Sequence, residues 1–338
     1  MENDSFYQCG SCGYCLDTCA VYSATYREAL SPRGKCVLLR KELENIIDSG
    51  SITEQLYTCT LCGRCEDVCP SKIEIVDAVQ TWRNNHPFKN NVLDSSVASI
   101  FEKGNPYNEM QPQREKWHQG LGSDPDADTA YFPGCTTSLL QPQIAHQFIT
   151  FVQDQLPLQV IDDVCCGSIL AKTGFLIKSK LIMEGNIKYF KNRGIKTLIT
   201  SCAGCYSHFL EYPSIKVLHT SQVLIRYVDE LEPQSFLTTY HDPCHLVRNS
   251  VTSEPRHILK TLSIYNEKES QSCCGAGGGM LLNFRDVADS ICSQMLKDSH
   301  PDITMVTACP YCLYHMKRNS FHRMISLEEF VTSCIREV

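Results

Sequence analysis

The chain has 338 residues, of which 43% are hydrophobic and 20% are charged, a composition that supports folded cores and excludes a disordered protein. Its formal net charge is −7 and no long basic run occurs, so we expect no nucleic-acid partner. No apolar run reaches the length of a membrane span, and the first residues lack a secretory signal, so we expect a cytoplasmic protein.

Eight of the 21 cysteines form two motifs of the type C-x2-C-x2-C-x3-C. This spacing is typical of bacterial ferredoxins, in which three cysteines of one motif bind a cubane [4Fe–4S] cluster and the fourth binds the other cluster. Zinc is disfavoured because its structural sites use four ligands from two separated pairs. The sequence therefore predicts two cubane clusters, one bound by Cys9, Cys12, Cys15 and Cys69, the other by Cys59, Cys62, Cys65 and Cys19.

Helical patterns connect and follow these motifs. Ser31 and Pro32 are a typical N-cap and first residue of a helix. The residues that follow at helical spacing predict an apolar stripe that packs between the two cluster loops: Leu38, Leu39, Leu43, Ile46 and Ile47. Further helices are expected from 71 to 85 and from 92 to 103. Residues 1–103 are thus predicted to form a helical ferredoxin domain with two clusters.

Residues 104–128 are rich in Gly, Pro, Asn and Asp and lose all periodicity, which predicts a linker. The aromatic residues Tyr107 and Trp117 indicate that this linker lies against the protein surface.

From residue 129 onwards, short strands alternate with helices, which predicts α/β units with parallel strands. Strands are expected at 130–132, 159–161 and 196–200, with helices at 140–153 and 177–192. The pattern then repeats, so the fold class is α+β: a helical ferredoxin domain followed by a pseudo-symmetric pair of α/β domains at 129–233 and 234–338.

Ten further cysteines mark this repeat, because five of them recur at offsets of 107 to 109 residues. The first quintet is Cys135, Cys165, Cys166, Cys202 and Cys205. The second quintet is Cys244, Cys273, Cys274, Cys309 and Cys312. In parallel α/β sheets, ligands bind beyond the carboxyl ends of the strands, where most of these cysteines are expected to lie. Spacing alone does not decide which cluster five thiols hold. The remaining Cys36, Cys292 and Cys334 are expected to fill the core.

The sequence resembles the heterodisulfide reductase D subunit family, in which a C-type ferredoxin domain is fused to two B-type CCG domains. The most specific stretches are PGC at 133–135, CCGSILAKTG at 165–174, HDPCHL at 241–246 and CCGAGGG at 273–279. The resemblance implies that each quintet binds a noncubane [4Fe–4S] cluster. It also implies that the cubanes relay electrons to these clusters, which cleave a disulfide such as that of coenzymes B and M.

The resemblance also suggests a proton donor, His245, whose imidazole titrates near neutrality. A hydrogen bond to cluster sulfur is the alternative role for this residue. Alternation along a strand would point His241 elsewhere, so we expect it to be structural. Lys172, Arg248 and Arg285 are near the cysteine motifs and could bind the anionic groups of the substrate, although each is more simply a surface charge.

The sequence shows no flavin, haem or molybdenum motif, so we expect electrons from a partner subunit. The resemblance suggests a flavin-bearing subunit, a membrane cytochrome b, or a hydrogenase or formate dehydrogenase module, and any membrane association would be peripheral, through that partner. An alternative function is a non-catalytic electron-transfer subunit in a flavin-dependent complex of the glycerol-3-phosphate, glycolate or lactate dehydrogenase type. A zinc-bearing scaffold is a third hypothesis, and iron analysis would separate it from the two iron–sulfur functions.

Overall fold

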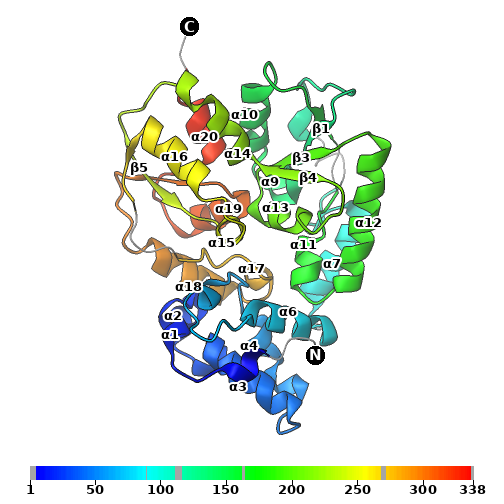
Figure 1. The fold of residues 1–338 in the computed structure, drawn as a ribbon, viewed down its shortest axis with the longest axis vertical. Helices are drawn as coiled ribbons and strands as arrows, with labels where there is room; N and C mark the ends of the chain where they lie inside the picture. Colours follow the sequence, from blue (N-terminus) through cyan, green and yellow to red (C-terminus); the bar gives the residue numbers. More distant parts are fainter. Residues whose placement is uncertain (1–4, 89, 111–115, 162–163, 268–271, 336–338) are drawn as a thin grey trace. The chain divides into compact units, whose positions relative to one another are not determined.

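The computed structural model describes residues 5–88, 90–110, 116–161, 164–267 and 272–335 (Figure 1). These residues form two compact units. Unit 1 comprises Met1–Asp94, Ile169–Lys180 and Ser272–Lys297, and unit 2 comprises Ser95–Ser168, Leu181–Gln271 and Asp298–Val338. The segment after the first cysteine pair, Ile169–Lys180, therefore folds with the ferredoxin motifs, and so does Ser272–Lys297, which includes the second pair. The limits expected at 103, 128 and 233 stay predictions, and part of the expected linker, 111–115, lies outside the described residues.

Unit 1 is helical. Its elements are η1 (Ser5–Gln8), α1 (Tyr14–Asp17), α2 (Ala20–Thr25), η2 (Glu28–Leu30), α3 (Pro32–Leu43), η3 (Ser49–Ile52), α4 (Thr53–Tyr57), α5 (Arg64–Asp67), α6 (Ile75–Asn85), α17 (Met280–Asn283) and α18 (Arg285–Leu296). The predicted start of α3 is confirmed, because the Ser31 side chain accepts a hydrogen bond from the Gly34 N–H and Pro32 is the first helical residue. Late in the chain, α18 packs against α2.

The apolar stripe predicted on α3 is largely confirmed. Leu39 is fully buried in the core of unit 1, and Leu38, Leu43 and Ile47 pack against that core. Ile46, in contrast, is 62% exposed. The helix ends at Leu43 and Asn45 adopts a left-handed conformation, with φ of 56°, so the helical spacing no longer applies at Ile46.

Unit 2 contains two parallel four-stranded sheets with the same topology (Figure 1). The first has the order β2-β1-β3-β4 and the second β6-β5-β7-β8. The strands of the first sheet are β1 (Thr129–Tyr131), β2 (Gln159–Val160), β3 (Thr197–Thr200) and β4 (Lys216–His219). Those of the second are β5 (Leu237–His241), β6 (Ile264–Tyr265), β7 (Thr304–Thr307) and β8 (Met324–Ser326). The predicted α/β repeat is therefore confirmed.

Helices lie between the strands of each sheet, as crossovers between parallel strands require, and also follow the last strand. In the first half they are α9 (Gly134–Leu140), α10 (Pro142–Val152), α11 (Ser168–Lys172), α12 (Leu176–Asn192), α13 (Ala203–Phe209), α14 (Thr220–Leu224) and η5 (Ile225–Glu230), of which residues 169–180 belong to unit 1. In the second they are α15 (Cys244–Val247), α16 (Ser253–Leu262), α19 (Pro310–Asn319) and α20 (Leu327–Thr332), whereas α17 and α18, between β6 and β7, belong to unit 1. None of the described helices is long and apolar enough to cross a membrane.

The segment predicted as a surface linker is more deeply packed than expected. It follows α7 (Asn91–Lys103) and includes η4 (Lys116–His118). Trp117 is only 2% exposed and meets Tyr131 of β1 edge to face, with the ring centroids 5.7 Å apart. The Tyr107 hydroxyl lies 2.8 Å from the Thr136 hydroxyl. Trp117 is therefore part of the core of unit 2 and Tyr107 is half-buried, which composition alone did not indicate.

Candidate functional site

The two ferredoxin-type motifs adopt the same backbone conformation. Ser11 and Leu61 both have φ of 56°, and Gly13 and Gly63 have φ of 89° and 82°. Left-handed residues at matching positions curve the backbone of each motif around its own centre. The two glycines are then the N-caps of the short helices α1 and α5. This local geometry is suited to wrapping three thiols around an inorganic cluster, as the spacing predicts.

The eight thiols of these motifs line two cavities in unit 1. The outer thiol set, Cys9, Cys12, Cys15 and Cys69, lines one cavity, together with Arg33 and Cys36. The inner thiol set, Cys19, Cys59, Cys62 and Cys65, lines the other, together with Lys35. Cys65 borders both cavities, and Cys12 is exposed to solvent. Each set is thus brought together as four thiols, the number that a cubane cluster takes.

The first quintet is gathered completely within unit 2. Cys135 and Cys166 lie within hydrogen-bonding reach of Cys165, and Cys205 lies within reach of Cys166. Cys202 lies within reach of Cys205 in turn. Cys135 lies at the start of α9, shortly after β1, and Cys165 and Cys166 form the CCG turn. Cys202 and Cys205 lie at the start of α13, shortly after β3. Since β1 and β3 are neighbours where the strand order reverses, the quintet occupies the crevice where such sheets bind ligands.

Buried polar side chains hold the backbone of the first CCG turn. The Asn186 side chain donates to the carbonyl oxygen of Cys165 at 3.2 Å, and the Tyr212 hydroxyl donates to that of Cys166 at 2.7 Å. Asn186 also donates to the Tyr212 hydroxyl at 3.1 Å. Burial, followed by the nearby charge of Cys166, raises the pKa of Tyr212, so it remains a neutral donor.

Gly134 shows how closely the backbone approaches these thiols. Its φ is +75°, and a Cβ atom at this position would lie 3.0 Å from the Cys205 Sγ. Only glycine combines this conformation with so close an approach.

The structure describes the second quintet in two parts. Cys244, Cys309 and Cys312 belong to unit 2, at the ends of β5 and β7, whereas Cys273 and Cys274 belong to unit 1. The second CCG turn matches the first, because the N–H groups of Gly275 and Gly167 each donate to the sulfur of the first cysteine of their turn at 3.4 Å. A common cluster for all five thiols remains a prediction.

The two quintets meet within unit 2, where the Cys202 thiol lies within hydrogen-bonding reach of Cys309. The pKa of Cys205 is raised by the hydrogen bonds that its thiol donates to Cys166 and Cys202 and by burial, because a buried cluster of thiols disfavours several negative charges. Bound metal cations would reverse that preference, since thiols bind metals as thiolates.

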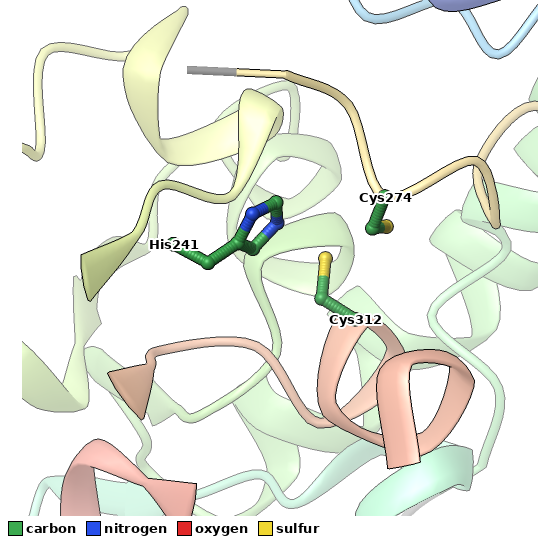
Figure 2. Close-up of side chains that lie close together, drawn as sticks. All are labelled: His241, Cys274 and Cys312. Carbon is green, nitrogen blue, oxygen red and sulfur yellow. The ribbon is translucent and has the colours of Figure 1, made fainter. Parts of the chain in front are cut away.

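Two histidines flank the second quintet. The Nδ1 atom of His245 lies 3.6 Å from the Cys244 Sγ, so the predicted proton donor is next to a thiol of this quintet. His241 is buried, and its ring nitrogen lies within 4.8 Å of the Cys312 Sγ. Figure 2 shows the His241 ring turned towards Cys312; Cys274, in the same view, belongs to unit 1. The expectation that His241 points elsewhere was wrong, because it is the last residue of β5 and alternation ends there.

Asp242 anchors the loop that carries Cys244. Its buried carboxylate accepts two hydrogen bonds from Arg256, at 2.6 and 2.5 Å. Such bidentate pairs fix geometry as well as charge. The candidate anion-binding residues are less well placed: Arg248 and Arg285 are exposed, and Lys172 is half-buried. Cys36, Cys292 and Cys334 are buried, as expected of core residues.

One contact in unit 1 connects a ferredoxin motif with a CCG motif. The Cys62 thiol lies within hydrogen-bonding reach of the Cys273 thiol, which raises the pKa of Cys62 well above its usual value, with burial as the second cause. The inner thiol set is therefore adjacent to Cys273, the first cysteine of the second CCG turn. No periodicity or spacing in the sequence could indicate this pairing of residues 211 positions apart (273 − 62).

A buried arginine, Arg83 of α6, was missed by sequence reasoning. It is fully buried, and its guanidinium donates only to backbone carbonyl oxygens of unit 1: Leu56, Tyr57, Cys59, Lys172 and Gly278. These acceptors belong to three separate segments of the chain. The helical pattern of residues 71–85 does not distinguish a buried cation from an exposed one, and only the fold shows what Arg83 binds.

Comparison with known proteins agrees with this arrangement. Residues 5–73 match the 4Fe-4S dicluster domain, and residues 129–210 and 238–317 each match the cysteine-rich domain. The D subunit of the dihydromethanophenazine:CoB–CoM heterodisulfide reductase of Methanosarcina mazei is 29% identical, over 94% of this chain and 88% of the relative. The chain therefore carries one 4Fe-4S dicluster domain and two cysteine-rich domains, and it resembles the heterodisulfide reductase D subunit over most of its length. It is an iron–sulfur oxidoreductase, as its cysteine-rich and dicluster domains indicate.

Other relatives have different names. The B subunit of the fumarate reductase (CoM/CoB) of Methanothermobacter marburgensis is 28% identical, over 91% of this chain and 67% of the relative. The EtfAB:quinone oxidoreductase of Syntrophomonas wolfei subsp. wolfei is 25% identical, over 77% of this chain and 43% of the relative. Relatives of the chain thus include subunits of a heterodisulfide reductase and of a fumarate reductase, and a quinone oxidoreductase.

Proposed function

We propose that this chain is the catalytic subunit of a disulfide reductase and that the two quintets act on the two sulfur atoms of one substrate disulfide. The observation that carries the proposal is the contact between Cys202 and Cys309, because it brings a thiol of each quintet to one position in unit 2. An electron-transfer subunit would need only one cluster at such a position. Two adjacent sites suit a bond that must receive two electrons.

The donor sets fit iron–sulfur clusters. They consist of free thiols, and the inner and outer sets each offer four of them, as a cubane requires. Each quintet offers one thiol more, which supports a noncubane [4Fe–4S] cluster. When bound, these clusters would supply electrons one at a time and iron sites with affinity for sulfur. The protein residues contribute the positions of the thiols, the exclusion of water and the protons.

The overall reaction breaks one sulfur–sulfur bond, consumes two electrons and two protons, and yields two thiols. The electrons come from a reduced partner subunit, since several relatives are named as subunits of reductases. His245 is the proposed source of one proton, because its ring is next to Cys244 at the second quintet. The CoB–CoM heterodisulfide, named for the Methanosarcina relative, is the first substrate to test.

The decisive experiment is anaerobic purification of the full chain, followed by iron analysis and an assay of CoB–CoM disulfide reduction with a reduced viologen. About sixteen iron atoms per chain are expected for four clusters. Cys205→Ala should abolish turnover and leave the cubane signals intact. Cys334→Ala is the matched control, because this cysteine is also buried but belongs to neither quintet. A fully loaded protein without activity would contradict the proposal.

The second candidate is an electron-transfer subunit, which the similarity to the EtfAB:quinone oxidoreductase favours. It predicts full iron content, reduction by a flavoprotein and no reaction with any disulfide. The viologen assay separates the two candidates, because only the first requires that electrons leave through the quintets to a sulfur compound.

A further inference from the structure

Two buried cations surround the inner thiol set, and neither has a carboxylate partner among the described residues. Lys35 is 2% exposed, and its ammonium group donates to the carbonyl oxygen of Leu30. Arg83 is fully buried and binds carbonyl oxygens alone. Burying a cation without a nearby negative charge is expensive. Some other anion must therefore compensate these two charges.

The inner thiol set is the nearest source of that negative charge. Lys35 lines the same cavity as Cys19, Cys59, Cys62 and Cys65. The Arg83 Nη2 donates to the Cys59 carbonyl oxygen at 2.9 Å. The attraction of Lys35 opposes the increase in the pKa of Cys19 that burial causes, so its charge acts on a thiol of this set. A thiolate-bound cluster would supply an anion at this position.

The outer thiol set has a different environment. Its nearest cation, Arg33, donates to the Ser11 carbonyl oxygen at 3.2 Å. Arg33 is also paired with the Glu28 carboxylate at 2.8 Å, and 28% of its side chain is exposed. Neutralisation by the carboxylate and screening by water leave little net field at the outer set. The two sets therefore share a loop conformation but differ in the charge around them.

We propose that Lys35 and Arg83 are positioning residues for electron transfer, and that their buried charges raise the reduction potential of the cluster held by the inner thiol set. Reduction adds one negative charge to a cluster, and a nearby buried cation stabilises the reduced form more than the oxidised form. The electron comes from the cluster of the outer set, which the partner subunit reduces. The cations thus draw electrons towards Cys62 and its neighbour Cys273.

This inference rests on the proposed function only in that the inner set must hold a redox-active cluster. Arg83 has a second role, because it joins the Cys59 loop to the backbone of Lys172 and Gly278 at 2.8 and 2.9 Å. The same side chain therefore holds the two CCG-derived segments of unit 1 against the inner set. Its loss would disturb structure as well as charge, so Lys35 offers the cleaner test.

The test is a potentiometric titration of the anaerobically purified full chain, followed by EPR, which resolves the two cubane signals. Lys35→Gln removes the charge and keeps an N–H donor for the Leu30 carbonyl. We expect one cubane to become about tenfold harder to reduce, which is about 59 mV for one electron, while the other is unchanged. Lys41→Gln is the matched control, because Lys41 is on the same helix and exposed. It should shift neither signal.

Glu66 provides a test of sign. Burial and the neighbouring thiols are the larger causes of the raised pKa of Cys65, and the negative charge of Glu66 adds to them. The Glu66 carboxylate also accepts a hydrogen bond from the Val76 N–H at 2.7 Å. Glu66→Gln keeps an acceptor and removes the negative charge. It should shift the same cubane as Lys35→Gln, but in the opposite direction, and leave the other cubane unchanged.

Three outcomes would overturn the inference. One is that Lys35→Gln leaves both potentials unchanged, and another is that it shifts both equally. The third is that Lys35→Gln no longer assembles the inner cluster, which would show that the residue builds the site and does not tune it. Absence of cubane signals in the unmodified chain would instead contradict the proposed function, so the two failures can be told apart.

Discussion

The hydroxyl group of Tyr212 offers a direct test of how the first CCG turn is held. Tyr212 is 3% exposed, and its hydroxyl donates to the Cys166 carbonyl oxygen at 2.7 Å. Tyr212→Phe removes that donor without changing the shape of the ring. The Cys166 carbonyl and one donor of Asn186 would then have lost their bond to this hydroxyl.

The expected cost follows from this geometry. A buried polar group that loses its partner costs about 1–3 kcal/mol. A destabilisation of 1 kcal/mol lowers the melting temperature of a domain of about 200 residues by roughly 2–4 °C. At about 2 kcal/mol, the middle of that range, Tyr212→Phe should lower the melting temperature of the loaded chain by about 4–8 °C. Because the bond holds Cys166 itself, iron should also leave the first quintet faster in the presence of a chelator.

The assay is anaerobic thermal unfolding by circular dichroism, together with the rate of iron release to a chelator. Tyr206→Phe is the matched control: Tyr206 is 6% exposed, and its hydroxyl forms no hydrogen bond with the residues that the structure describes. It should change neither quantity appreciably. If both variants lost the same stability, or if Tyr212→Phe matched the unmodified chain, the hydroxyl would not hold the turn and the reasoning would fail.

Three further predictions concern the same unit. Gly134→Ala should remove about a quarter of the iron of a four-cluster chain, because its Cβ would collide with the Cys205 sulfur, whereas Gly185→Ala, in open space, should load fully by iron analysis. Burial lowers the pKa of His219 from 6.5 to about 4. The neutral imidazole therefore contributes fully to the free energy of unfolding above pH 6.5, and about 3 kcal/mol of that free energy is lost as the pH falls to 4. Denaturant titrations should show that the stability of His219→Gln depends less on pH. His245→Gln should lower disulfide turnover by about 10²–10⁴-fold and flatten its pH profile, while an unchanged profile would assign the proton to another group.

Local features of this chain were predictable because they depend on residues close in sequence. The cap at Ser31, the parallel α/β repeat and the matching turns at Gly13 and Gly63 all follow from short patterns. The first quintet could be grouped for the same reason, since its cysteines follow strands whose carboxyl ends share one edge. Ile46 shows the limit, because a pattern continued past the end of its helix predicted the wrong environment.

The remaining features depend on which segments fold together, and no local pattern encodes that. Residues 169–180 and 272–297 belong to unit 1 although each is surrounded in sequence by unit 2. The contact of Cys62 with Cys273 and the carbonyl partners of Arg83 exist only because of this arrangement. His241 was misassigned for a smaller reason, because the direction of a side chain at the last residue of a strand is set by the following turn.

These contacts also relate neighbouring thiol sets within each unit. In unit 1, Cys65 borders the cavities of both the outer and the inner set, and Cys62 of the inner set lies within reach of Cys273. In unit 2, Cys309 lies within reach of Cys202. Electron transfer favours short separations, so electrons that enter at the outer set should pass through the inner set to Cys273. In the proposed function, where Cys273 and Cys309 serve one cluster, a disulfide would therefore receive its first electron from the second quintet, whose Cys244 is next to the proposed proton donor, His245.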